Sequence, residues 1–233
     1  MYNSNLYDDI VATLKNKPKK TEIDFYRKKV ETLFSGECKK ILYLKGEYII
    51  KEKHKDSSIY FVDRGKVVLT RKDVYGKEYS SGYFLPGEFF GFSSLIDMPE
   101  EFNYKALTNC SLHVIDTESV KNKLNEDYEL KNHFNEMLIN IMRNVSSRQG
   151  NLILGGCRSS FVNFVLEHMY NFGSIDENGD IVVLLDVTLA EIASILNMTR
   201  ETLSRIVSEM KRDGIIETKR RFIKIIDIAR FIA

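Results

Sequence analysis

The sequence is poor in cysteine, in long apolar runs and in net charge. Its three cysteines, Cys38, Cys110 and Cys157, are scattered and odd in number among 233 residues, which is typical of reduced thiols in the cytoplasm. We expect Cys157 to be a small buried side chain. No apolar run approaches the roughly 18 residues of a membrane-spanning helix, and the N-terminus lacks the apolar core of a signal peptide. These absences predict a cytoplasmic protein without a membrane partner.

The sequence also lacks the signatures of common enzymes. It has no Walker loop, no GxGxxG motif and no Ser/His/Asp signature. A cupin-type oxygenase holds its metal with closely spaced histidines and a carboxylate, but His54, His113, His133 and His168 form no HxH or HxxxH pair. We therefore predict a protein that is not an enzyme and has no metal site.

The charge is balanced over the whole chain but uneven along it. Lysine and arginine number 34 against 33 acidic residues, which gives a formal net charge of +1. Residues 199–221 contain seven basic and four acidic residues, a local excess of three positive charges. A basic patch on a neutral chain suits double-stranded DNA better than a membrane surface.

Residues 41–116 alternate between glycine turns and short runs of β-branched and aromatic residues. The runs include Tyr48–Ile50, Ile59–Val62, Val67–Thr70 and Leu112–Ile115. Many short strands separated by glycines indicate an antiparallel sandwich or a jelly roll. The first 40 residues have the pattern of polar helices that pack on this domain, and we assign residues 1–118 to the N-terminal domain as a whole.

Residues 119–150 have helical periodicity, and about 30 helical residues would extend roughly 45 Å. The apolar stripe is wide enough for one contact with the β domain and another with a partner helix. The residues expected at the dimer contact are Leu130, Phe134, Met137, Leu138, Ile141 and Val145. A core helix without a partner is the alternative interpretation. Gly155 and Gly156 then mark a hinge into the C-terminal domain, residues 151–233.

Residues 188–210 predict two short helices joined by a tight turn. Thr188 begins a capping box with Glu191, Thr199 is the expected cap of the second helix, and both helices carry apolar residues at helical spacing. The polar residues gathered on the opposite face of the second helix are Arg200, Glu201, Ser204, Arg205 and Ser208. Such groups can bond base edges in the major groove, so the pair indicates a DNA-binding helix-turn-helix. A helical hairpin with a merely solvated polar face is the alternative.

A short hairpin follows the second helix over about residues 215–226. Its turn carries the basic residues Lys219, Arg220 and Arg221. A hairpin at this place makes the assembly a winged helix-turn-helix, and we expect its basic tip to contact DNA phosphates.

The order of these parts resembles the CRP/FNR superfamily of bacterial transcription regulators over about residues 40–226. Residues 199–205 resemble the recognition helix of that family, and residues 63–67 and 86–91 resemble turns of its sensor domain. The resemblance implies an α+β protein with a cyclic-nucleotide-binding-like jelly roll as sensor domain, a long dimerisation helix and a winged helix-turn-helix. It also implies a homodimer that binds an inverted-repeat operator, with RNA polymerase as a candidate partner. By the same resemblance, Glu201 and Arg205 read the half-site and Thr188 contacts a phosphate.

The sensor domain departs from the cyclic-nucleotide pattern of the family. In nucleotide-binding members a glutamate follows the glycine that matches Gly91, and an arginine with a serine or threonine comes a few residues later. This chain has Phe92 and the pair Glu100–Glu101 at those places. Carboxylates repel a phosphate, so we predict that cAMP does not bind.

Other effectors stay open. An iron–sulfur cluster needs about four thiolate ligands, which Cys38 and Cys110 cannot supply. Haem is an alternative, with His133 as the candidate axial ligand, and the regulator would then be a gas sensor of the same fold. A small metabolite, a protein partner or no effector at all is equally compatible with the sequence, as is a ligand-binding module that acts through protein contacts.

Overall fold

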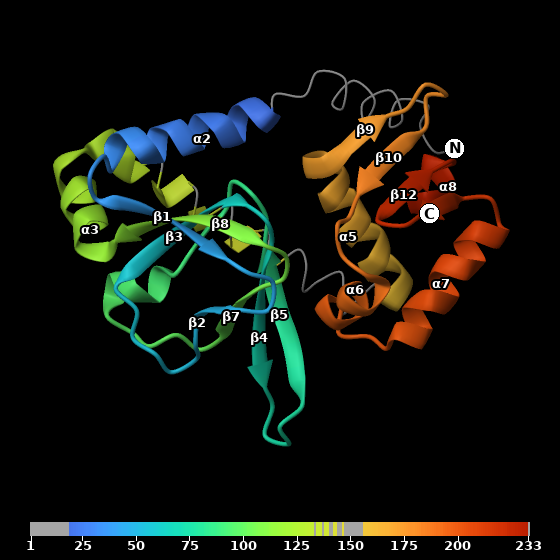
Figure 1. Cartoon of the computed structure of the whole chain (residues 1–233), viewed down its shortest axis with the longest axis horizontal. Helices are drawn as coiled ribbons and strands as arrows, with labels where there is room; N and C mark the ends of the chain where they lie inside the picture. The colour runs from blue at the N-terminus through green and yellow to red at the C-terminus, as the bar shows by residue number, and fades with distance from the viewer. Residues whose placement is uncertain are drawn as a thin grey trace. The chain divides into compact units, whose positions relative to one another are not determined.

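The computed structural model describes residues 19–132, 134–136, 138–139, 142–143, 146 and 156–232. They form two compact units, one within residues 22–147 and the other carrying the described residues 156–232 (Figure 1). Among the helices described, none combines the length and the apolar character needed to cross a bilayer.

The N-terminal unit contains two antiparallel sheets of four strands each. The strand order is β1-β8-β3-β6 in one sheet and β2-β7-β4-β5 in the other. The strands are β1 (Cys38–Tyr43), β2 (Tyr48–Ile50), β3 (Ser58–Arg64), β4 (Val67–Lys72), β5 (Glu78–Phe84), β6 (Phe89–Phe90), β7 (Asn103–Ala106) and β8 (Cys110–Asp116). The chain crosses repeatedly from one sheet to the other, and only the long β4–β5 hairpin stays within a sheet (Figure 1). The predicted jelly roll is confirmed.

Two glycines allow close approaches of the backbone at the turns of this domain. Gly65 has φ +90°, and a Cβ there would lie 2.5 Å from the carbonyl oxygen of Asn109. Gly91 has φ +88° and precedes the short 3₁₀ helix η1 (Phe92–Ile96); a Cβ there would lie 2.8 Å from the carbonyl oxygen of Ser58. A side chain at either place would be strained and would clash. The turns at residues 63–67 and 86–91 therefore each require glycine for a steric reason.

Aromatic rings fill the interior between the sheets. Tyr60 stacks on Phe90 with 4.9 Å between ring centroids, and Phe90 stacks on Tyr104 at 5.0 Å. A second buried cluster includes Val30 of helix α2 (Lys19–Leu33) and the following Phe34, which pack with residues of β3 and β8. The C-terminal end of the N-terminal helical segment therefore packs on the β domain, as expected, and residues 1–18 lie outside the described residues.

The segment predicted as one long helix is interrupted at Asp127. Helix α3 (Thr117–Glu126) ends there, because Asp127 has an extended backbone, φ −121° and ψ 105°. The described residues from Tyr128 onward are helical again, and the Asp127 carboxylate accepts a hydrogen bond of 2.9 Å from the backbone N–H of Leu130. An N-cap aspartate starts a new helix in this way. The prediction of a single helix over residues 119–150 is therefore wrong at its N-terminal end.

The second helical segment shows two kinds of apolar residue. Leu130, Phe134 and Leu138 are half-buried, and Phe134 packs edge-on against Phe92 with 5.8 Å between centroids. The side chains of Ile139 and Met142, by contrast, are exposed. The remaining residues predicted for the dimer contact, Met137, Ile141 and Val145, lie outside the described residues, as does His133.

The C-terminal unit consists of a four-stranded antiparallel sheet with helices packed on it (Figure 1). The strand order is β11-β12-β10-β9. Its elements are α5 (Gly156–Phe172), β9 (Gly173–Ile175), β10 (Ile181–Leu184), α6 (Leu189–Ile195), α7 (Arg200–Arg212), β11 (Ile216–Lys219), β12 (Phe222–Ile225) and α8 (Ile228–Ile232). The sequence predicted α6, α7 and the hairpin of β11 and β12. The short elements β9 and α8 complete the sheet and the core.

The start of α5 corrects one expectation. Cys157 is exposed and not buried, because it lies in the first turn of α5 and the buried residues of this helix begin only at Ser160 and Phe161. Gly156 is the first residue of α5 and has φ +65°. Its neighbour Gly155 lies outside the described residues.

Candidate nucleic-acid interface

Helix α6 begins with a complete capping box. The backbone N–H of Glu191 donates to Thr188 Oγ1 at 3.3 Å, and the backbone N–H of Thr188 donates to Glu191 Oε2 at 2.7 Å. The Thr188 hydroxyl also donates to Glu191 Oε2 at 3.0 Å. This arrangement satisfies two donors at the helix start. The hydroxyl of Thr188, predicted to contact a phosphate, is engaged within its own helix.

A tight turn joins α6 to α7. Asn197 has φ +52°, a conformation that asparagine tolerates better than most residues, and the Met198 N–H donates to the Ala193 carbonyl at 2.9 Å. Thr199 Oγ1 then accepts from the Thr202 N–H at 3.1 Å and caps α7. The predicted helix-turn-helix and both of its caps are present.

The two faces of α7 differ as its sequence period requires. Its buried residues are Leu203, Ile206, Val207 and Met210, which pack in the core with Ile192, Ala193 and Ile195 of α6. Its exposed face carries Arg200, Glu201, Ser204, Arg205 and Ser208. Among the described residues, no ion pair involves Arg200, Glu201 or Arg205. These three charged side chains are thus available to an external partner.

The wing is a tight hairpin whose three basic residues are not equivalent. Lys219 of β11 pairs with Phe222 of β12, so that Arg220 and Arg221 form the turn between them, with Arg220 at φ +52°. Lys219 and Arg220 are exposed and form no ion pair with a described residue. Arg221, in contrast, forms an ion pair with Asp186, which follows β10. No local pattern signals this pairing in advance, because 35 residues separate the partners.

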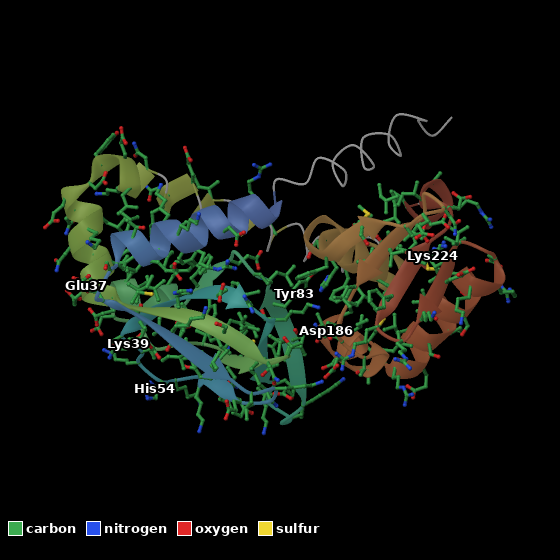
Figure 2. The ribbon with its side chains drawn as sticks, turned by 45° about the horizontal axis from the view of Figure 1, so that its top comes forward. Glu37, Lys39, His54, Tyr83, Asp186 and Lys224 are labelled. Carbon is green, nitrogen blue, oxygen red and sulfur yellow. The ribbon has the colours of Figure 1, made fainter. Side chains whose placement is uncertain are left out.

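Another cation of the same sheet has a structural role. Lys224 Nζ lies 2.8 Å from a carboxylate oxygen of Asp176 and 2.7 Å from one of Asp180, at the turn between β9 and β10. These contacts raise the pKa of Lys224, and the hydrogen bond from Lys224 lowers that of Asp176. Lys224 and Asp186 occupy separate parts of the unit (Figure 2). Two aspartates neutralise Lys224, which sets it apart from the cations of the wing tip.

The carboxylate pair of the sensor domain is divided between the interior and the surface. Glu100 is 3% exposed, and its Oε2 accepts hydrogen bonds of 3.1 Å from the hydroxyls of Ser93 and Tyr104. Its Oε1 is buried without a hydrogen-bond partner. Burial raises the pKa of Glu100, the two hydroxyls partly offset this effect, and the charge of Asp56 adds to it. A buried, partly unsatisfied carboxylate therefore stands next to the Gly91 turn.

The adjacent Glu101 has a different environment. Its side chain is exposed, and its Oε2 lies 3.7 Å from a guanidinium nitrogen of Arg71. Only the first glutamate of the pair therefore affects the interior of the barrel.

Asp63, near the end of β3, is a second buried carboxylate of the sensor domain. It is 2% exposed and is bonded to Arg27 of α2, Lys40 of β1 and the Ser111 hydroxyl. Burial would raise the pKa of Asp63, but the hydrogen bonds and charges of Lys40 and Arg27 outweigh burial and hold the pKa below its usual value. Asp63 thus fastens the N-terminal helix to the barrel.

Two of the described histidines, His113 and His168, are buried in their domains, whereas His54 is exposed. His113 is buried, with Nδ1 3.4 Å from Cys38 Sγ and Nε2 3.6 Å from Glu31, and burial lowers its pKa. His168 lies inside the C-terminal unit with Nδ1 2.8 Å from the Phe164 carbonyl oxygen. No cluster of three or more His, Cys, Asp or Glu side chains suited to a metal occurs in the part of the chain that the structure describes.

These features define a class of protein: a regulator in which a jelly-roll sensor domain is followed by a DNA-binding winged helix-turn-helix. Comparison with known families gives the same result. Residues 40–127 match the cyclic nucleotide-binding domain, and residues 162–233 match the Crp-like helix-turn-helix domain. The chain belongs to the CRP/FNR superfamily of transcription regulators, as its sequence motifs predicted.

Similar proteins cover nearly the same length. The transcriptional regulator LdrP of Thermus thermophilus is 23% identical over 192 residues, which is 82% of this chain and 90% of LdrP. A CRP-like cAMP-activated global transcriptional regulator of Mycobacterium tuberculosis is 22% identical over 80% of this chain and 83% of its own. Among solved structures, FixK2 of Bradyrhizobium japonicum has a TM-score of 0.71 at 22% identity, covering 83% of this chain and 95% of FixK2. This last likeness concerns the fold.

Proposed function

We propose that this protein is a homodimer that binds an inverted-repeat DNA operator in a sequence-specific manner and regulates transcription in the cytoplasm. Each protomer would insert α7 into the major groove, and the two helices would occupy successive grooves about 34 Å apart. The observation that carries the proposal is the exposed face of α7, whose Arg200, Glu201 and Arg205 have no ion pair among the described residues.

Each side chain of the interface has a role that follows from its chemistry. Arg205 and Arg200 can donate two hydrogen bonds to guanine, Glu201 can accept from the cytosine amino group, and Ser204 can bond either kind of base. Lys219, Arg220 and Arg221 of the wing would contact phosphates and fix the register of the protein on the duplex. Thr188 would join them by turning its hydroxyl hydrogen from Glu191 to a phosphate. Thr199 contributes as the cap of α7.

The dimer contact would be formed by the helical segment after Asp127. Leu130, Phe134 and Leu138 lie at helical spacing and are half-buried, while Met142 is 69% exposed. Met137, Ile141 and Val145 continue the same apolar stripe in the sequence. A partly exposed apolar stripe of this kind is typical of a helix that pairs with a copy of itself.

We further propose that neither cAMP nor an iron–sulfur cluster is the effector. Glu100 places a buried carboxyl group in the sensor interior, and its ionised form would repel an anionic phosphate. The three cysteines lie in different environments, because Cys38 is half-buried, Cys110 is buried and Cys157 is exposed. RNA polymerase remains a candidate partner of the bound dimer.

The test begins with the purified full-length chain and a library of random DNA duplexes. Repeated selection should enrich an inverted repeat, and light scattering should give twice the monomer mass of 27.0 kDa. Enrichment of no sequence, or a strictly monomeric protein that still binds the selected duplex, would contradict the proposal. A thermal-shift titration with cAMP and a spectral titration with hemin examine the effector, and micromolar binding of cAMP would overturn our view of the sensor domain.

A further inference from the structure

The segment between β10 and α6 holds the tip of the wing at two points. The Leu185 N–H donates to the Arg221 carbonyl oxygen at 2.9 Å, and the next residue, Asp186, accepts from the Arg221 guanidinium through its carboxylate. Asp186 has φ +51°, which few residues other than glycine adopt. It lies two residues before Thr188, the cap of α6. The contact therefore brings the guanidinium of Arg221 to the start of the helix-turn-helix.

The ion pair is exposed, so stability alone does not account for it. The side chains of Arg221 and Asp186 are 69% and 42% exposed, and exposed pairs contribute little to folding. The backbone hydrogen bond between Leu185 and Arg221 already attaches the wing turn. What the carboxylate adds is a fixed orientation for a long, otherwise mobile side chain.

The guanidinium keeps free donors while it is held in this way. A guanidinium carries five N–H donors in one plane, and Asp186 takes a hydrogen bond from Nη1. No second ion pair of Arg221 occurs among the described residues. An arginine in this state can donate its remaining N–H groups to a phosphate without releasing the aspartate, because its five donors point in several directions of one plane.

We propose that Asp186 is a positioning residue for DNA binding, which orients Arg221 so that its open N–H groups meet a backbone phosphate. The ion pair persists in the complex, and Lys219 and Arg220 bind phosphates without such support. This inference rests on the proposed function. A carboxylate ordinarily repels DNA, but the carboxylate of Asp186 would here favour DNA binding.

The experiment compares full-length variants on a duplex selected by the wild-type protein, over a range of salt concentrations. Arg221→Ala should weaken binding and reduce the slope of log K against log salt by about 0.9 per protomer. Asp186→Asn should also weaken binding, by roughly 2- to 10-fold, because the arginine side chain must then be ordered on binding. The matched control is Glu217→Gln, which removes one exposed negative charge from β11 of the same wing and should leave affinity equal or slightly higher.

The double variant tests whether Asp186 affects DNA binding through Arg221 or independently of it. In the Arg221→Ala background, Asp186→Asn should change affinity no more than Glu217→Gln does there, because Asp186 acts through Arg221. Tighter binding by the single variant Asp186→Asn would overturn the proposal and make Asp186 a competitor of the phosphate. Equal weakening in both backgrounds would overturn it as well. If the wild-type protein selects no duplex, the proposed function fails first, and that outcome is distinct from a failure of the coupling alone.

Discussion

Replacement of Arg205 by alanine separates reading of DNA from folding of the domain. Arg205 is exposed on α7, whereas Leu203, two residues earlier, is completely buried in the same helix. No ion pair with a described residue is lost when Arg205 is shortened. We therefore expect Arg205→Ala to fold like the wild-type protein and to lose only its contact with DNA.

The magnitude follows from the proposed geometry. One bidentate arginine–guanine pair gives about 1–3 kcal/mol of discrimination against the wrong base. A dimer makes this contact once in each half-site, so that the loss over a symmetric operator is about 2–6 kcal/mol, or roughly 30-fold to 10⁴-fold. Part of the affinity falls on every sequence, because a positive charge near the phosphates is removed. The ratio of affinities for matched and mismatched operators isolates the specific contribution.

Fluorescence anisotropy with labelled duplexes measures this ratio. The operator is compared with a duplex in which one guanine–cytosine pair of each half-site is changed, and every such pair is changed in turn. Arg205→Ala should lose discrimination at one pair and retain it at the others, whereas Ser208→Ala, on the same exposed face, should retain it at all pairs. If Arg205→Ala discriminates as well as the wild-type protein at every pair, our placement of the reading face is wrong.

Three further changes test other parts of the molecule. Leu203→Ala should destabilise the C-terminal unit by about 2–5 kcal/mol in urea unfolding, because removal of a buried leucine side chain leaves a cavity. Ser204→Ala is the control, and equal stability of the two variants would contradict the packing. Glu100→Gln should remove a pH dependence of stability. Burial raises the pKa of Glu100, so the folded protein binds this proton more tightly than the unfolded chain does. The free energy of unfolding of the wild type therefore falls as the pH rises from the ordinary glutamate pKa through the raised one. The free energy of unfolding of the wild type minus that of Glu100→Gln should therefore fall as the pH rises above the ordinary glutamate pKa, and a difference that does not change with pH would refute the assignment. Met142→Glu should shift the protein towards monomer in light scattering, because it places a charge on the apolar stripe. The control Glu136→Gln changes an exposed neighbour and should stay dimeric. If Met142→Glu stays dimeric, this face does not form the dimer contact.

Local periodicity was sufficient to predict much of the C-terminal unit. In α7 the apolar residues recur every three or four positions, and this spacing alone determines which side chains face the core and which face solvent. The caps at Thr188 and Thr199 were equally readable, because their partners Glu191 and Thr202 lie within one turn. The glycine turns of the β domain were also predicted, but the close approaches of Gly65 to Asn109 and of Gly91 to Ser58 depend on residues far apart in the sequence.

Predictions that depended on continuity of a pattern were less reliable. The apolar stripe continues through residues 119–150, but Asp127 interrupts the helix because its carboxylate caps the Leu130 N–H and its own backbone is extended. Periodicity measures where side chains point and is insensitive to one residue that leaves the helical conformation. Cys157 shows a related error, because its amino-acid type suggested burial while its position in the first turn of α5 exposes it.

The environment of each charge is the property that the sequence could not supply. Glu100 and Glu101 are adjacent and chemically identical, yet one is buried with an unsatisfied oxygen and the other is exposed near Arg71. Lys219, Arg220 and Arg221 form one basic cluster in the sequence, yet within the described part of the chain only Arg221 is held by a carboxylate, from a segment 35 residues away. A count of charges therefore predicts that the wing attracts DNA, since the long-range field depends on their sum. It cannot predict which cation is oriented before binding, since that depends on a contact that only the folded chain creates. For this reason the salt dependence of binding should respond to each of the three wing cations, whereas coupling to Asp186 should belong to Arg221 alone.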